Sequence, residues 1–194
     1  VGNLGHCHPK VMQGVRDQIS KLIFVPNNYY HPFQAKLAKE LIYQSFPGKV
    51  FFANSGAEAN EGAIKLARKF GKGRYEIITF ENAFHGRTLA TLAATGQKKY
   101  QFGFEPMPEG FKQVKFNDLE AVKQALTAKT VAIMLELIQG EGGVNVAEKD
   151  FVLGLRKLCD DLNLLLIIDE VQTGIGRTGK MFGYQNYEIV PDVM

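Results

Sequence analysis

The sequence contains no tryptophan and only two cysteines, Cys7 and Cys159, among its 194 residues. Two cysteines are too few for the disulfide framework of a small secreted domain. The first residues, VGNL, have no signal-peptide character, and no apolar run approaches the roughly 20 residues that span a bilayer. We therefore expect a cytoplasmic protein that is neither disulfide-rich nor built from membrane-spanning helices.

A large excess of charge of one sign is also missing. The chain has 23 Lys and Arg residues against 20 Asp and Glu residues, a net charge of +3. Proteins that bind nucleic acid or acidic membranes through electrostatic attraction usually carry a much stronger basic balance. We expect neither kind of partner.

Histidine is scarce as well, and three possible metal ligands cluster in residues 6–8, His-Cys-His. No second pair of ligands follows at the spacing of a zinc site, so we expect no metal centre. The His8-Pro9 pair instead predicts a helix with proline at its first position. Its spacing predicts one buried face made of Val11, Val15, Ile19 and Leu22.

With 45% hydrophobic residues, the chain can form a single domain over residues 1–194. Helical and strand patterns alternate, which predicts an α/β fold with a mostly parallel sheet and helices on both faces. We predict helices at 9–22, 33–45, 58–71, 118–127 and 149–162, and strands at 50–54, 75–80, 131–136 and 164–169. Residues 96–113 are predicted to be a long functional loop, and Asn117 to cap the helix after it, with Glu120 completing a capping box.

The most informative segment is LLLIIDEVQTG, residues 164–174. Its five successive apolar residues predict a strand covered on both faces, as in a parallel sheet. The strand ends at Asp169, at the sheet edge where open α/β sheets bind ligands. A carboxylate in that position is a candidate for catalysis.

A possible anion site lies upstream, where a short apolar run ends at Asn54 and a helical pattern follows. Between them, Ser55, Gly56 and Ala57 form a turn of small residues at the predicted helix N-terminus. Unpaired N–H groups and the helix dipole favour a phosphate there. The simpler interpretation, a serine that only caps the helix, remains equally open.

Residues 84–88, FHGRT, follow the strand at 75–80 and bring an aromatic ring and a guanidinium to the same sheet edge. The planar fork of Arg87 suits a substrate carboxylate. Taken alone, Phe84 is more typical of a core residue and Arg87 of a surface charge.

A nucleotide-binding alternative rests on residues 174–180, GIGRTGK, which satisfy G-x-G-x-x-G. A P-loop would need Ser or Thr after the lysine, where this chain has Met181. The glycines also do not come directly off the strand, and residues 181–187 lack a helical pattern. We regard this function as a remote alternative.

Four segments occur in register: SGAEANE at 55–61, FHGRT at 84–88, QGEGG at 139–143 and IDEVQTGIGRTG at 168–179. Together they resemble the class III, or ornithine-type, aminotransferases that use pyridoxal phosphate. The resemblance covers the chain from residue 3 to residue 194. Within the class, residues 96–100 and 103–106 most resemble acetylornithine aminotransferases of arginine biosynthesis, with ornithine or succinylornithine enzymes as alternatives.

The resemblance implies the central part of the large domain of the fold type I pyridoxal phosphate enzymes, and it implies a role for each matching residue. Asp169 would pair with the pyridine nitrogen of the cofactor, which a nearby carboxylate keeps protonated. Arg87 would hold the substrate carboxylate, and Glu141 would pair with a second substrate-binding arginine outside this sequence. The implied cofactor contacts are Ser55, Gly56, Ala57, Phe84, His85, Asp169, Val171 and Gln172.

The resemblance also implies parts that this sequence lacks. The Schiff-base lysine and the C-terminal small domain would follow Met194, so we interpret the chain as an incomplete large domain that is inactive alone. The expected substrates of the complete enzyme are N-acetylornithine and 2-oxoglutarate, the expected cofactor is pyridoxal 5′-phosphate, and the expected assembly is a homodimer. The second hypothesis is a non-catalytic remnant that binds the cofactor or serves a structural role.

Overall fold

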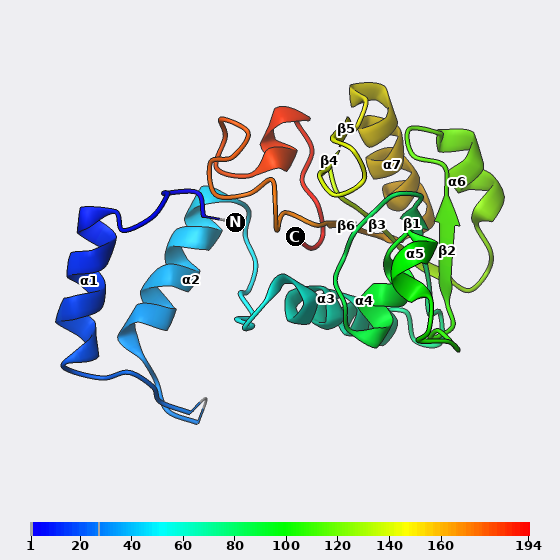
Figure 1. Cartoon of the computed structure of the whole chain (residues 1–194). Helices are drawn as coiled ribbons and strands as arrows, with labels where there is room; N and C mark the ends of the chain where they lie inside the picture. The colour runs from blue at the N-terminus through cyan, green and yellow to red at the C-terminus, as the bar shows by residue number, and fades with distance from the viewer. Residues whose placement is uncertain (1, 27) are drawn as a thin grey trace. The chain divides into compact units, whose positions relative to one another are not determined.

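The computed structural model describes residues 2–26 and 28–194. The chain divides into two compact units, residues 1–50 and 51–194 (Figure 1). The single domain predicted over 1–194 stays a prediction. All the residues proposed for the site belong to the second unit.

The first unit contains two helices, α1 (Pro9–Ile19) and α2 (Pro32–Gln44). Proline occupies the first turn of α1, as predicted. The predicted buried face of α1 is wrong, because Val11, Val15, Ile19 and Leu22 are between 42% and 59% exposed. Periodicity identifies an apolar stripe, but burial requires a partner surface, and within the described residues of the first unit none covers this stripe.

The second unit is built on a four-stranded sheet in the order β2-β1-β3-β6, with every neighbouring pair parallel. A small antiparallel pair, β4-β5, follows β3. The strands are β1 (Glu76–Phe80), β2 (Phe111–Val114), β3 (Thr130–Leu135), β4 (Ile138–Gln139), β5 (Asn145–Val146) and β6 (Leu165–Ile168). The helices are α3 (Gly56–Phe70), α4 (Leu89–Ala94), α5 (Lys98–Gln101), α6 (Leu119–Ala125), α7 (Lys149–Leu162) and the 3-10 helix η1 (Gly183–Asn186).

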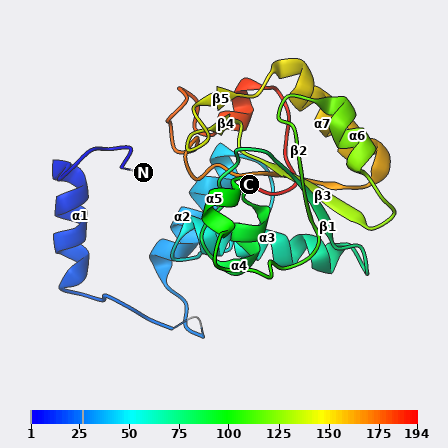
Figure 2. The same ribbon diagram turned by 45° about the vertical axis from the view of Figure 1, so that its right-hand side comes forward.

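Helices cover both faces of this sheet, which confirms the predicted α/β architecture. Figures 1 and 2 show α3 and α4 on one side and α6 and α7 on the other. Every residue of β3 is buried, as a central strand covered on both faces requires. On one face Ile64 and Ala67 of α3 pack with Ile77, and on the other Phe80, Phe116 and Phe151 meet edge to face.

Three local predictions need correction. Residues 50–54 form no strand, because no strand pairs with them in the part of the chain that the structure describes, and Phe51 is 77% exposed. The predicted loop at 96–113 contains α5 and the start of β2. The cap of α6 is Asp118, whose side chain accepts from the backbone N–H of Ala121, whereas Asn117 takes a positive φ of 58°.

Candidate functional site at the carboxyl ends of β1, β3 and β6

Asp169 follows β6 directly and is only 6% exposed. Its backbone N–H donates to the carbonyl of Leu135, so the residue remains tied to β3. Its Oδ2 accepts from Asn60 Nδ2 at 2.8 Å and lies 2.8 Å from His85 Nδ1. Its Oδ1 accepts from the N–H of Val171 at 3.0 Å. The carboxylate predicted at the sheet edge is therefore fixed by three contacts.

The turn of small residues lies at the N-terminus of α3, as predicted. Ser55 is the N-cap, and its Oγ accepts from the N–H of Glu58 at 3.2 Å. This bond uses the N–H of Glu58, not those of Gly56 and Ala57. The capping interpretation thus describes Ser55 correctly, and it leaves the anion interpretation of the turn intact.

The turn and the Asp169 segment are in direct contact at Gly56. A Cβ atom on Gly56 would lie 2.7 Å from Cγ2 of Val171 and 2.9 Å from its Cγ1, which real Cβ atoms essentially never show. Gly140 faces the end of the flexible Gln172 side chain, which an added Cβ would displace. Glycine at position 56 lets the turn close against residues 169–172.

Phe84 and Arg87 lie beside each other after β1. Phe84 is half-buried and packs edge to face against Tyr100, with ring centroids 5.7 Å apart. The exposed guanidinium of Arg87 lies 4.3 Å from the centroid of Tyr100 and 5.6 Å from that of Phe84. Phe84 is thus not a fully buried core residue. Tyr100, to which the sequence analysis gave no role, orients Arg87.

Two further polar residues of α3 were missed. Asn60 is buried, and its Nδ2 donates to both the carbonyl of His85 and the carboxylate of Asp169. Glu61 accepts from Thr88 Oγ1 at 2.5 Å and from the N–H of Ala90 at 3.1 Å, where α4 begins. The detectable signal was a polar residue, Asn60, four positions before Ile64 on the buried face of the helix.

Glu136 was also missed, although a carboxylate directly after the apolar run at 131–135 is a visible signal. It is 7% exposed, and its Oε2 accepts from the N–H of Phe84 at 2.9 Å. Burial raises the pKa of Glu136 to about 7, although His85 and the Phe84 N–H act to lower it. The site thus contains two buried carboxylates, from β3 and β6, with His85 near both.

Asp169 and Glu170 are consecutive but have different tasks. Whereas Asp169 faces Asn60 and His85, Glu170 accepts from the N–H groups of Gly183 and Tyr184 at 2.9 and 2.8 Å. Glu170 therefore holds the start of η1, which is a structural task.

The family model for class III aminotransferases matches residues 1–194. The chain belongs to the class III aminotransferases. It is 56% identical to the acetylornithine aminotransferase of Methanocaldococcus jannaschii, covering 100% of this chain and 50% of that protein. It is 55% identical to that of Caldanaerobacter subterraneus, covering 100% of this chain and 51% of that protein. The chain thus spans about half the length of the curated relatives it matches.

Solved structures of this class have the same fold. The N-acetylornithine aminotransferase of Stenotrophomonas maltophilia matches with a TM-score of 0.84 and 38% identity over 100% of this chain and 50% of that one. A taurine:2-oxoglutarate aminotransferase of Bifidobacterium kashiwanohense, solved with PLP and glutamate, matches with a TM-score of 0.93 and 30% identity over 98% of this chain and 49% of that one. The predicted membership and the predicted aminotransferase fold are confirmed.

Most of the predicted site residues of this class III aminotransferase come together around Asp169. Gly56, between Ser55 and Ala57, adjoins Val171; Ala57 adjoins Gly86; Gln172 lies across Gly140; and His85 contacts the carboxylate of Asp169. Phe84 precedes His85 and reaches Glu136 through its N–H. Glu141 is exposed in the turn between β4 and β5.

The alternatives to the aminotransferase interpretation lack their structural context. Residues 171–180 form turns, and the four-residue η1 follows them, so the glycines do not open an α-helix as a nucleotide site requires. Among the described residues there is no group of three or more side chains that could hold a metal ion. No helix in the described ranges is long and apolar enough to cross a membrane.

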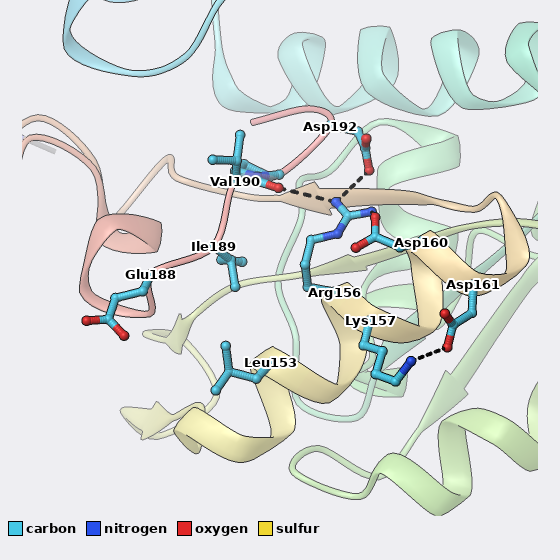
Figure 3. Close-up of a pocket in the computed structure, with 10 residues that line it drawn as sticks. Leu153, Arg156, Lys157, Asp160, Asp161, Glu188, Ile189, Val190 and Asp192 are labelled. Carbon is cyan, nitrogen blue, oxygen red and sulfur yellow. Dashed lines mark hydrogen bonds and ion pairs between the residues drawn. The ribbon is translucent and has the colours of Figure 1, made fainter.

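A shallow pocket beside α7 lies apart from this site (Figure 3). Arg156 dominates it, donating to Asp192 Oδ2 at 2.8 Å and to the carbonyl of Val190 at 3.3 Å. Asp192 Oδ2 also accepts from the N–H of Leu166. Val193 forms an isolated parallel β-bridge with Ile167. These contacts fasten residues 190–193 alongside β6.

Proposed function

We propose that this protein is the acetylornithine aminotransferase of arginine biosynthesis, which moves the δ-amino group of N-acetylornithine to 2-oxoglutarate with pyridoxal 5′-phosphate as cofactor. The observation that carries the proposal is the contact of Gly56 with Val171, which sets a phosphate-type helix N-terminus beside a buried carboxylate. A ligand with a phosphate at one end and a protonated ring nitrogen at the other fits this pair.

The residues present fit the cofactor. Backbone N–H groups of Gly56 and Ala57 would bind the phosphate at the N-terminus of α3, where the helix dipole favours negative charge. The ring would lie between half-buried Phe84 and exposed Val171, and Gln172 would donate to the phenolic oxygen of the ring. His85 supports the site through Asp169, because the contact of its Nδ1 with Asp169 Oδ2 orients the carboxylate.

When bound, the cofactor supplies an electron sink for the carbanion that forms on loss of the proton from the amine-bearing carbon. The residues of this chain would keep the ring able to accept these electrons. Asn60 and the Val171 N–H both donate to Asp169, and a carboxylate held in this way would accept from the ring nitrogen and favour its protonated form. Arg87 would bind a substrate carboxylate at the mouth of the site, and Glu141 would pair with a second arginine.

The identity of the amino donor rests on the relatives. Two acetylornithine aminotransferases are 56% and 55% identical to this chain. Ornithine and succinylornithine are the competing donors. We further propose a homodimer, in which a second copy would cover the exposed apolar stripe of α1. We also propose a cytoplasmic location.

The proposal is tested on the protein as its gene encodes it. Pyridoxal phosphate should bind, and kcat/KM for N-acetylornithine with 2-oxoglutarate should exceed that for ornithine and for succinylornithine. A higher kcat/KM for another donor would reassign the substrate. Binding of the cofactor without transfer from any of the three donors would support the non-catalytic alternative. Sedimentation of a monomer at micromolar concentration would refute the proposed dimer.

A further inference from the structure

Asn60 occupies a position where three parts of the site meet. It lies on α3, one helical turn after the proposed phosphate-binding residues Ser55, Gly56 and Ala57. One Nδ2 group reaches the carbonyl of His85 and Oδ2 of Asp169, both at 2.8 Å. An amide –NH₂ carries two hydrogens, so these two bonds use its full capacity to donate. A buried amide that joins two other segments in this way is well placed to orient them.

The two oxygens of Asp169 are occupied unequally. Oδ2 meets both Asn60 Nδ2 and His85 Nδ1; in the Nδ1–H tautomer of His85 both nitrogens donate, and they fill the lone pairs of this carboxylate oxygen. Oδ1 accepts from the N–H of Val171 and keeps one acceptor position. Asn60 therefore helps to decide which oxygen of Asp169 is available to a ligand.

The same amide fixes the backbone of His85. The carbonyl of His85 accepts from Asn60, and its N–H donates to Thr95 Oγ1 at 3.0 Å. The imidazole is fully buried, and its Nε2 has no hydrogen-bond partner among the described residues. Because Nδ1 contacts Asp169, the position of the ring depends on the two backbone hydrogen bonds of His85, with Asn60 and with Thr95.

We propose that Asn60 is a positioning residue for the cofactor site: by donating to Asp169 Oδ2 and to the His85 carbonyl, it holds Asp169 with Oδ1 free to accept from a protonated ring nitrogen. The inference rests on the proposed function, because it assigns that ring nitrogen to pyridoxal phosphate. Asn60 acts through Asp169 and His85 and makes no contact with the substrate.

Two nearly isosteric variants separate donation from packing. Asn60→Leu fills similar space without a donor. Asn60→Asp keeps the shape, and its carboxyl can donate to Asp169 only while protonated, because two adjacent carboxylates cannot both ionise without cost. Ala63→Ser, on the same helix and outside these contacts, is the control for general disturbance of α3.

The probe is 4′-deoxypyridoxine 5′-phosphate, which has the ring nitrogen and the phosphate but no aldehyde, so its dissociation constant reports binding separately from catalysis. Asn60→Leu should bind it about tenfold more weakly than the wild type at every pH, as for loss of a hydrogen bond to a charged group. Asn60→Asp, whose protonated carboxyl has one hydrogen where the amide has two, should bind less tightly than the wild type at pH 5.5, and the loss should grow to at least about tenfold near pH 8. Glu136 and His85 face the same cluster in every variant, so the quantity compared is the ratio to the wild type at each pH.

Circular dichroism checks that each variant is folded. The pH dependence of Asn60→Asp compares one folded protein with itself, so a general folding defect cannot produce it. Equal affinities of Asn60→Leu and the wild type, or a pH-independent ratio for Asn60→Asp, would overturn the role of Asn60. If the wild type itself fails to bind the probe, the proposed function fails, and this result is distinct from failure of the inference.

Discussion

The buried carboxyl of Glu136 makes a quantitative prediction about stability and pH. Burial raises its pKa from the ordinary 4.5 to about 7, with His85 and the Phe84 N–H acting in the opposite direction. The folded protein therefore binds this proton more tightly than the unfolded chain does. The stability from this group is fully present below pH 4.5 and is lost as the pH rises through about 7.

The magnitude follows from the two pKa values. At about 1.4 kcal/mol for each pH unit, the interval from 4.5 to about 7 corresponds to roughly 3 kcal/mol of unfolding free energy. Glu136→Gln removes the titration while its amide oxygen can still accept from the Phe84 N–H. Relative to the wild type, the variant should gain about 2.5 kcal/mol of stability between pH 5 and pH 8, because the wild type loses the rest of this contribution below pH 5.

The assay is denaturant unfolding of the cofactor-free protein, wild type and Glu136→Gln, at half-unit steps from pH 5 to pH 8. Glu120→Gln serves as the control, because Glu120 lies exposed on α6 in a surface pair with Lys123. A difference between wild type and Glu136→Gln that does not change with pH would refute the raised pKa. A difference that grows as the pH falls would show that the carboxyl is stabilised in its charged form.

Further predictions concern catalysis, packing and thiol reactivity. Asp169→Ala in the protein as its gene encodes it should keep bound cofactor but lose turnover by at least about 100-fold, because the ring nitrogen loses its charged partner. Unchanged turnover would refute the role of Asp169, and Asp161→Ala, an exposed residue paired with Lys157, is the control. Gly56→Ala should destabilise the fold by about 1–3 kcal/mol, because the added methyl group clashes with Val171. In denaturant unfolding, the double variant Gly56→Ala/Val171→Ala should recover part of this loss. Equal stability of the single and the double variant would contradict the contact. Burial raises the pKa of the Cys159 thiol to about 12 although Arg156 lowers it, so peptide mapping after native alkylation should find exposed Cys7 modified and Cys159 unmodified. Rapid native modification of Cys159 would contradict its burial.

The parts of the fold that depend on local pattern were predictable. The apolar runs at 131–135 and 164–168 identified two buried parallel strands, and the apolar stripe of α7 gave bounds that match the structure. The turn of small residues that begins at Ser55, followed by a helical pattern, located the start of α3 to within two residues. These features depend on periodicity and capping, which a single sequence carries.

The parts that depend on distant partners were not predictable. Residues 50–54 have the composition of a strand, but a strand exists only where another chain segment completes its hydrogen bonds. The stripe of α1 was assigned to a core because spacing cannot reveal whether a surface covers it. The residues that hold Asp169 come from 109 and 84 positions away, so Asn60 could not be linked to it by motif alone.

Because Asp169 and Glu170 contact different parts of the molecule, β6 should tolerate substitutions more readily than insertions or deletions. Side chains alternate along an extended segment, so a shift of one residue would exchange the carboxylate that faces Asn60 with the one that anchors η1. A deletion of one residue within β6 would therefore damage the site and the η1 anchor together. A deletion compensated by an insertion, both placed before Asp169, would return the two carboxylates to register and preserve both roles. The parity of the segment before Asp169 is thus under tighter constraint than the identity of its apolar residues, which can exchange among Leu, Ile and Val at small cost.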